Sequence, residues 1–400
     1  MNFLLNFLII TCLTTTSSTA MELNISKRET PNILTKVTCV EEPFHALYLA
    51  ENRMLINGRK QCSIVNPTTN QELKRIADNG YWKSSIAVHP NKTKFAFCGY
   101  YSPGDIDNAE QKIMIYNAHT YELEHTKNWD HASIRNVFFS PLDDTIAIVE
   151  VSNPDVSLYN YKTNEAVIIT IPEAAIEHQQ EYEPIVCFDP TQQLLILAWN
   201  HVYIYNLTTA QKKSTGHSNS CHSFFEYSSN GLFCVKGTRY TVVLDKKIDN
   251  QPLPFFRDRT VISKHNQTSS FCQVAIHPNN TIFMTLSRAT DHILTSHYFL
   301  EYRDSETSDP ITTMSIALKG YQEDSSLSVS PHGKKLLITT DNECIELEVP
   351  FEVLYKGITK ETFPYLLFLL KNYTSHCNDV EIPQDINHFI AKMLLETCKR

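Results

Sequence analysis

One strand-and-turn pattern recurs along this chain at intervals of roughly fifty residues, and it constrains the fold more than any other feature. In each copy a short alternating strand runs into a polar turn, and a second apolar strand follows. The turn prolines of five copies are Pro90, Pro141, Pro190, Pro278 and Pro331. A sixth copy begins at His222 and has Ser229 in place of proline, and a degenerate copy begins at His45, so the sequence contains seven units.

Each unit continues with a third strand whose last residue is Asn or Asp, and in four copies a Thr follows three residues later. The stretches are CSIVNPTT, IMIYNAHT, VSLYNYKT and VYIYNLTT, and the residues that begin the turn are Asn66, Asn117, Asn160, Asn206 and Asp245. Asn and Asp side chains bond the backbone two residues on and tolerate left-handed geometry. We therefore interpret Asn-x-x-Thr as the turn between the third and fourth strands, without a catalytic role.

Repeats of this length built only from short strands are typical of propeller blades. We expect an all-β fold, a seven-bladed β-propeller over residues 21–350. The last unit has only three strands, and the segment NILTKVTCV at 32–40 can supply the fourth, which would close the ring and remove an exposed sheet edge. A two-sheet sandwich or an open solenoid is the alternative.

The units resemble divergent WD40-type repeats over about residues 32–350. The third strand ends in Tyr-Asn, as in IYNAHT and LYNYKT, where that family has Trp-Asp, and the family's Gly-His pair is absent. The family's buried Asp-His-Ser-Trp network is therefore not carried over to this chain. The resemblance implies a rigid platform that binds protein partners.

The first twenty residues have the composition of a secretion signal. An apolar run from Phe3 to Leu13 precedes a Thr/Ser stretch, and Ser18 and Ala20 supply the small residues of a cleavage site. We expect residues 1–20 to be removed and the protein to be secreted or placed in the periplasm or envelope. The alternative is an uncleaved membrane anchor.

Residues 351–400 lose the repeat and contain two amphipathic stretches, so we expect a C-terminal helical segment. It could pack over the propeller, or it could bind a partner, since IPQDINHFIAKML is loosely similar to the helix of F-box-type modules. Cys377 and Cys398 flank the second stretch and could form a disulfide after export. We expect most other cysteines to be free, because they lie next to large apolar residues in strands.

The charge is −9 and is spread thinly, with only isolated Lys-Lys pairs. Nucleic-acid binding needs a concentrated basic surface, so we expect no nucleic-acid partner. No internal segment is apolar enough to span a bilayer, so we expect no stable membrane span after signal cleavage. We expect a monomeric propeller.

Motifs that carry chemistry are few. The sequence has no GxSxG, P-loop, GxGxxG or HExxH, and we predict no catalytic, cofactor-binding or metal-binding residue. Two polar groups contain possible metal ligands, but we interpret both as solvated loops: His217, Cys221 and His222, and Asp105, Asp107 and Glu110. His125, His131 and His178 are scattered, and His89 and His277 precede prolines at equivalent strand ends, which indicates a structural role.

The sequence thus favours an exported, noncatalytic protein-interaction scaffold. The alternatives are a propeller hydrolase or lactonase with a site in the central tunnel, and an envelope sensor that binds a ligand or glycan. Glycosylation triplets begin at Asn24, Asn91, Asn206, Asn266, Asn279 and Asn372, and they matter only in a host that glycosylates exported chains.

Overall fold

The computed structural model describes most of the chain between residues 32 and 350. The gaps are 39, 41, 59–60, 78–80, 102–109, 131–133, 152, 154, 171–184, 190–192, 199–200, 218–223, 238–240, 247–257, 265–268, 290–295, 319–324 and 341–342, and Val353 is described as well. Every element in the described part is a β-strand. The predicted signal peptide, the C-terminal helices and the Cys377–Cys398 bridge lie outside the described residues.

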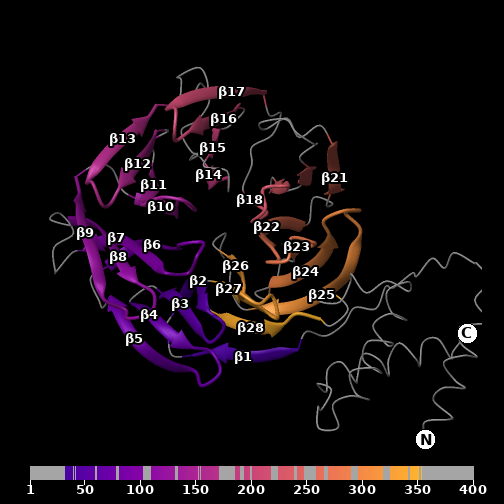
Figure 1. Ribbon diagram of the computed structural model, residues 1–400. Helices are drawn as coiled ribbons and strands as arrows, with labels where there is room; N and C mark the ends of the chain where they lie inside the picture. Colours follow the sequence, from indigo (N-terminus) through magenta and orange to yellow (C-terminus); the bar gives the residue numbers. More distant parts are fainter. Residues whose placement is uncertain are drawn as a thin grey trace, which may run out of the picture. The chain divides into compact units, whose positions relative to one another are not determined.

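The described strands form seven antiparallel sheets of four strands, which we number as blades in chain order (Figure 1). Blade 1 contains β2 (Pro43–Ala50), β3 (Arg53–Gly58), β4 (Cys62–Asn66) and β5 (Gln71–Ala77). Blade 2 contains β6 (Tyr81–Val88), β7 (Lys94–Tyr101), β8 (Glu110–Asn117) and β9 (Leu123–Trp129). Blade 3 contains β10 (Ile134–Phe139), β11 (Thr145–Glu150), β12 (Val156–Asn160) and β13 (Glu165–Ile169). Blade 4 contains β14 (Ile185–Phe188), β15 (Gln193–Ala198), β16 (His201–Asn206) and β17 (Gln211–His217).

The remaining blades follow the same order. Blade 5 contains β18 (Phe224–Tyr227), β19 (Phe233–Gly237), β20 (Thr241–Lys246) and β21 (Asp258–Lys264). Blade 6 contains β22 (Ser269–Ile276), β23 (Ile282–Ala289), β24 (Ser296–Asp304) and β25 (Pro310–Leu318). Blade 7 combines β26 (Ser326–Val329), β27 (Lys335–Thr339) and β28 (Cys344–Glu348) with β1 (Ile33–Val37) from the start of the chain.

The ring closes through β1, as the sequence predicted. This strand pairs antiparallel with β28, with Lys36 opposite Ile345 and Val37 opposite Cys344. Lys36 also forms an ion pair with Glu343. The outer edge of β28 is therefore covered by a segment more than 300 residues away in sequence, as the 307-residue separation of Lys36 and Glu343 shows. The prediction of an all-β propeller is confirmed.

The first strand of each blade contacts the first strands of both neighbours, in the cyclic order β2, β6, β10, β14, β18, β22, β26 and back to β2. The core lies in the seams between blades, where neighbouring sheets pack face to face. Between blades 1 and 2, for example, Leu55 and Ile64 pack with Phe95 and Phe97 in one buried cluster. Each blade therefore needs its neighbours to bury its apolar faces.

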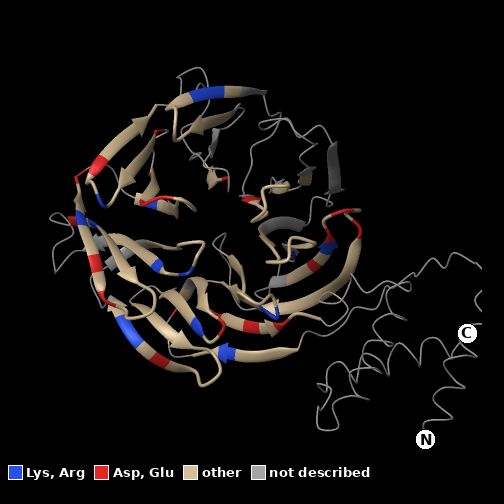
Figure 2. Cartoon of the chain, in the orientation of Figure 1, with Lys and Arg blue, Asp and Glu red and all other residues tan. Residues whose placement is uncertain are grey.

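The chain divides into two compact units, Lys27–Val349 and the two terminal segments Met1–Ser26 with Pro350–Arg400. The propeller belongs to the first unit. Among the residues that the structure describes, no helix has the length and hydropathy needed to cross a membrane. Outer strands such as β5 and β9 carry both basic and acidic residues (Figure 2).

Candidate interaction face

The repeated Asn begins a turn of one geometry in four blades. In each turn its Oδ1 accepts hydrogen bonds from the backbone N–H groups two and three residues on. The distances are 2.9 and 3.3 Å for Asn66, 2.9 and 3.1 Å for Asn117, 3.0 and 3.0 Å for Asn160, and 2.9 and 2.9 Å for Asn206. The prediction that Asn-x-x-Thr is turn chemistry is confirmed.

Blade 6 has the same turn, which the sequence analysis missed. Asp304 Oδ1 accepts from the backbone N–H groups of Glu306 at 2.6 Å and Thr307 at 3.1 Å. Its strand ends in Tyr-Arg-Asp, and the Asp-x-x-Thr spacing is intact, so the sequence contains the signal for this turn. The turn expected after Asp245 lies outside the described residues.

The fifth residue of each turn has a left-handed backbone. The residues are Asn70 with φ 54°, Tyr121 with φ 61°, Asn164 with φ 62°, Ala210 with φ 53° and Ser308 with φ 67°. Asn is the usual non-glycine residue in this region, and a bulky side chain there is an outlier. Tyr121 is that outlier.

The turns between first and second strands lie on the same side of the ring as the turns between third and fourth strands, because successive strands of a blade run in opposite directions. We call this side the turn face. His277 occupies a strand end there: its Nδ1 accepts from Asn279 N at 3.2 Å, and its Nε2 lies 3.0 Å from Gly333 O in blade 7. His89 Nδ1 accepts from Asn91 N in the same way, and burial lowers the pKa of His89. These contacts support the structural role expected for both histidines.

Side chains link the turns of consecutive blades around much of the turn face. Ser229 N of blade 5 donates to Asn280 Oδ1 of blade 6 at 2.9 Å, and His277 links blade 6 to blade 7. Ser330 Oγ of blade 7 donates to Glu51 Oε1 of blade 1 at 3.1 Å. Lys92 Nζ of blade 2 donates to the Tyr48 carbonyl of blade 1 at 3.1 Å. The turns of blades 5, 6, 7, 1 and 2 are therefore fixed relative to one another.

A similar link stabilises the inner wall. Ile276 N on β22 donates to Glu226 Oε1 on β18 at 3.3 Å, so the carboxylate partners a backbone group on the inner edge of the next blade. The Glu226 residue is half-buried, but its carboxyl group is surrounded by atoms of the propeller. Burial raises its pKa to about 8, although the Ile276 N–H and the Lys92 ammonium oppose the rise. Burial lowers the pKa of Lys92, and Glu226 opposes that shift.

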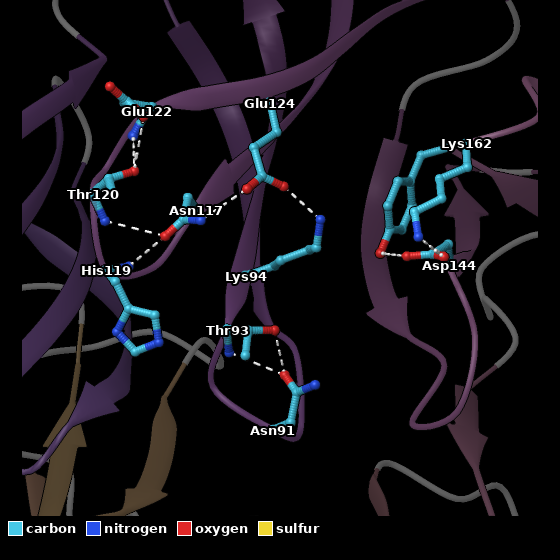
Figure 3. Close-up of polar contacts among 11 residues, drawn as sticks. Asn91, Thr93, Lys94, Asn117, His119, Thr120, Glu122, Glu124, Asp144 and Lys162 are labelled. Atoms are coloured by element: carbon cyan, nitrogen blue, oxygen red, sulfur yellow. Dashed lines mark hydrogen bonds and ion pairs between the residues drawn. The ribbon is translucent and has the colours of Figure 1, made fainter.

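Polar and aromatic contacts close the seam between blades 2 and 3 (Figure 3). Lys94 Nζ pairs with Glu124 Oε2 at 2.5 Å and lies 5.3 Å from the centre of the Tyr161 ring. The Tyr161 hydroxyl donates to Asp144 Oδ1 at 2.7 Å, and Lys162 Nζ pairs with Asp144 Oδ2 at 2.6 Å. Burial favours a higher pKa for Asp144, but the bonds from Lys162 and Tyr161 outweigh it and lower the pKa.

Deeper in this seam, His125 Nε2 lies 2.7 Å from the Tyr159 hydroxyl, which donates to Asn164 Oδ1 at 2.7 Å. Burial lowers the pKa of His125. The indole N–H of Trp129 donates to the buried Glu150 Oε1 at 2.7 Å. His125 is therefore part of the seam.

The two polar groups weighed as metal sites fall largely outside the described residues. This applies to Asp105, Asp107, Cys221, His222 and the side chain of His217, as it does to His131 and His178. Glu110 is described, at the start of β8, where it pairs with Lys112 at 3.0 Å. Within the described residues no group of three or more His, Cys, Asp and Glu is placed to hold a metal ion.

Three glycosylation triplets are described, and all begin in turns of the turn face: Asn91, Asn206 and Asn279. Those at Asn24, Asn266 and Asn372 lie outside the described residues. Five described cysteines are free thiols, namely Cys62, Cys98, Cys187, Cys234 and Cys344. All but the half-buried Cys187 are buried in strands, as the sequence predicted. Burial raises the pKa of Cys187 to about 12.

Comparison with known proteins agrees with this geometry at the level of the fold. No protein-family model matches the chain, and no curated protein matches it. A similar solved structure is the Myceliophteria thermophila Cps50 (Swd1) β-propeller domain, with a TM-score of 0.60 and 10% sequence identity. The match covers 80% of this chain and 100% of that domain. The chain therefore has a β-propeller fold, in keeping with the resemblance of its repeats to the WD40 type, and an identity this low shows the fold alone.

Proposed function

We propose that this protein is a noncatalytic scaffold that binds protein partners through the turn face. One observation carries the proposal: five third-to-fourth-strand turns share one backbone geometry while their exposed residues differ. The third residue of each turn is exposed, and these residues are Thr68, His119, Lys162, Thr208 and Glu306. A fixed frame that displays varied side chains suits recognition, because little conformational entropy is lost on binding.

Affinity capture with the full-length chain, using an extract of the source cells, tests this proposal. A turn-face variant would carry His119→Ala, Lys162→Ala and Glu306→Ala, all in exposed turns. A control variant would carry Thr126→Ala and Asn128→Ala on the exposed side of β9. We expect bound proteins to be lost from the turn-face variant and kept by the control. Equal recovery from wild type and turn-face variant would exclude the turn face as the recognition surface.

We also propose that the scaffold acts after export. The support is the composition of residues 1–20 together with the small residues Ser18 and Ala20. Intact-mass measurement of the protein purified from its source tests this directly. A mature chain that begins at Met21 is expected, and a chain that retains residues 1–20 would contradict cleavage.

A second candidate function, a hydrolase with a site in the tunnel, is favoured by the raised pKa of Glu226 on the inner wall. A carboxyl group that keeps its proton near neutral pH can act as a general acid. The test is hydrolysis of a panel of esters and lactones by wild type and by Glu226→Gln. Turnover that disappears in the variant would support the enzyme, and no turnover by either protein would remove the candidate.

A further inference from the structure

A groove of about 580 Å³ opens where the outer strand of blade 1 meets the last turn of blade 2. Lys74 and Arg75 of β5 line one side, and Tyr121 and Leu123 line the other. Tyr116 also lines the groove, and its ring stacks on Phe95 with centroids 5.0 Å apart. The groove therefore has a rigid aromatic wall beside a charged strand.

The same place in the seam between blades 2 and 3 is filled, and the sequence explains the difference. The residue after the turn-forming Asn is Tyr161 in blade 3 and Ala118 in blade 2. Their backbones are equivalent, because Tyr161 N donates to Asp144 O at 3.1 Å and Ala118 N donates to Thr93 O at 2.8 Å. The Tyr161 ring contacts Lys94 and His125 of blade 2 across its seam, whereas Ala118 contributes only a methyl group, which is buried in the core cluster that Tyr121 packs against.

A second difference concerns the outer strand. His125 lies opposite Ile115 in the β8–β9 ladder, and Lys74 lies opposite Ile64 in the β4–β5 ladder, so the two residues occupy equivalent places. His125 contacts Tyr159 and closes its seam. Lys74 is exposed and makes no ion pair with any residue that the structure describes. Lys74 therefore places an ammonium group beside the groove, at the position where the next seam has the His125 imidazole in contact with Tyr159.

Tyr121 gives an independent reason to expect a ligand. It holds a left-handed backbone, with φ 61°, at a position where the other described turns have Asn, Ala or Ser. Strain of this kind is concentrated at functional sites. The Arg53 guanidinium covers the Tyr121 ring at 5.7 Å from its centroid, which adds a second cation beside the groove. The ring is therefore held in place although the backbone disfavours it.

The groove suits a peptide that carries both carboxylates and apolar side chains. Tyr121 and Leu123, which is 50% exposed, offer apolar surface, and the largely buried Tyr116 adds the small exposed part of its side chain. Glu122 also lines the groove, and Arg75 is paired with Glu72 at 2.8 Å, so Lys74 is the cation among the lining residues that remains for a ligand. The chain as a whole carries −9, so the basic side of this groove reverses the average charge.

The outer strand supplies a further binding element. Among the described strands, β5 pairs with β4 alone, so its outer edge presents backbone N–H and C=O groups. An extended peptide can add to such an edge while alternate side chains enter a neighbouring groove. This geometry favours an extended ligand over a helical one.

We propose that this groove binds an extended, acidic segment of a partner protein, with an apolar side chain between Tyr116 and Tyr121 and a carboxylate facing Lys74. The proposal rests on the proposed scaffold function and names the chemistry of one partner segment. It adds a site on the outer side of the seam to the recognition surface of the turn face.

Selection from a library of short random peptides displayed on phage tests the proposal, with the full-length chain as bait. The same library would be counter-selected on Lys74→Glu and on Tyr121→Asn. Asn is chosen because Asn70 and Asn164 hold the equivalent turn position, so the backbone is accommodated while the ring is lost. Lys213→Glu on β17 is the control, since it makes the same charge change on an exposed outer strand away from the groove.

We expect enriched peptides to combine Asp or Glu with large apolar residues. In fluorescence polarisation, Lys74→Glu and Tyr121→Asn should each weaken the best peptide about tenfold or more, and Lys213→Glu should leave it unchanged. Replacing the peptide's acidic residues by lysine should restore affinity for Lys74→Glu. This charge exchange is an effect that a damaged fold would not produce.

The proposal is overturned if no peptide is enriched, if enriched peptides lack acidic residues, or if both groove variants bind as wild type does. It is also overturned if wild type is a dimer that Lys74→Glu converts to a monomer, because the groove would then bind a second copy. If the peptide experiments fail but affinity capture still depends on the turn face, the groove is excluded and the proposed scaffold function is retained. If peptides bind the groove but affinity capture does not depend on the turn face, the turn face is excluded as a recognition surface and the groove is retained.

Discussion

Replacing Gly333 by alanine would put a methyl group into the ring of His277. Gly333 has φ +73°, and a Cβ atom there would lie 2.0 Å from His277 Nε2 and 2.3 Å from Cε1. The same imidazole nitrogen lies 3.0 Å from the Gly333 carbonyl oxygen, in a buried contact that joins blades 6 and 7. The ring cannot accept the methyl group without moving, so we expect this contact to be lost.

The size of the effect follows from two contributions. An alanine held in the left-handed region costs about 1–2 kcal/mol. Loss of a buried hydrogen bond costs about 1 kcal/mol more. We therefore expect Gly333→Ala to lower the free energy of unfolding by about 2–3 kcal/mol, which in a domain of this size lowers Tm by roughly 5 °C.

Urea and thermal unfolding of Gly333→Ala, His277→Ala and the double variant would separate the contributions. Once His277 is alanine, neither the clash nor the hydrogen bond exists, so Gly333→Ala should then cost only the backbone part, about 1–2 kcal/mol. The two substitutions should therefore be less damaging together than the sum of the single effects. An equal cost of Gly333→Ala with and without His277 would refute the reasoning.

Three further outcomes test other parts of the ring. Because burial raises the pKa of Glu226 from its ordinary value of 4.5 to about 8, this carboxyl binds more protons in the folded state, so its contribution to stability should be full below pH 4.5 and fall as pH rises through about 8. Stability curves of wild type and Glu226→Gln should diverge over that range, and parallel curves would contradict the shift. Trp129→Phe removes the donor to the buried carboxylate of Glu150 and should cost about 1.5–3 kcal/mol in urea unfolding, whereas a loss below about 0.5 kcal/mol would mean that the bond adds little. Deleting residues 1–38 removes β1 and exposes the edge of β28, so size-exclusion chromatography should show aggregation that deletion of residues 1–31 does not cause, and identical monomer peaks would disprove closure by β1.

Much of the fold could be predicted because its signals are local. The turn that begins at Asn117 is made by hydrogen bonds from the backbone N–H groups of His119 and Thr120, two and three residues later. A short sequence window therefore contains the whole motif. The closing strand could be predicted because the last unit lacked a strand and an exposed edge is unfavourable. Asp304 has the same local signal, since Thr307 follows it three residues later, and its turn could have been predicted as well.

The contacts between blades could not be predicted in the same way. Lys92 donates to the carbonyl of Tyr48, and Ile276 N donates to Glu226, across separations of 44 and 50 residues. Neither pair has a sequence signal, because the partner is a backbone group whose position depends on how two sheets are set side by side. The links of the turn face are therefore products of ring closure.

The groove shows how one repeat position can stabilise the ring in one blade and leave a site in another. At the residue after the turn-forming Asn, the Tyr161 ring contacts Lys94 and His125 across its seam, whereas Ala118 contributes only a buried methyl group to the seam beside the groove. A repeat alignment treats the two residues as divergence at one column, because the alignment contains no information about the neighbouring blade. The difference between the two seams gains meaning only when Lys74 and Tyr121 are found to line a groove. In a closed ring of similar units, a groove that opens where one repeat position differs between blades is therefore a place to look for partner binding.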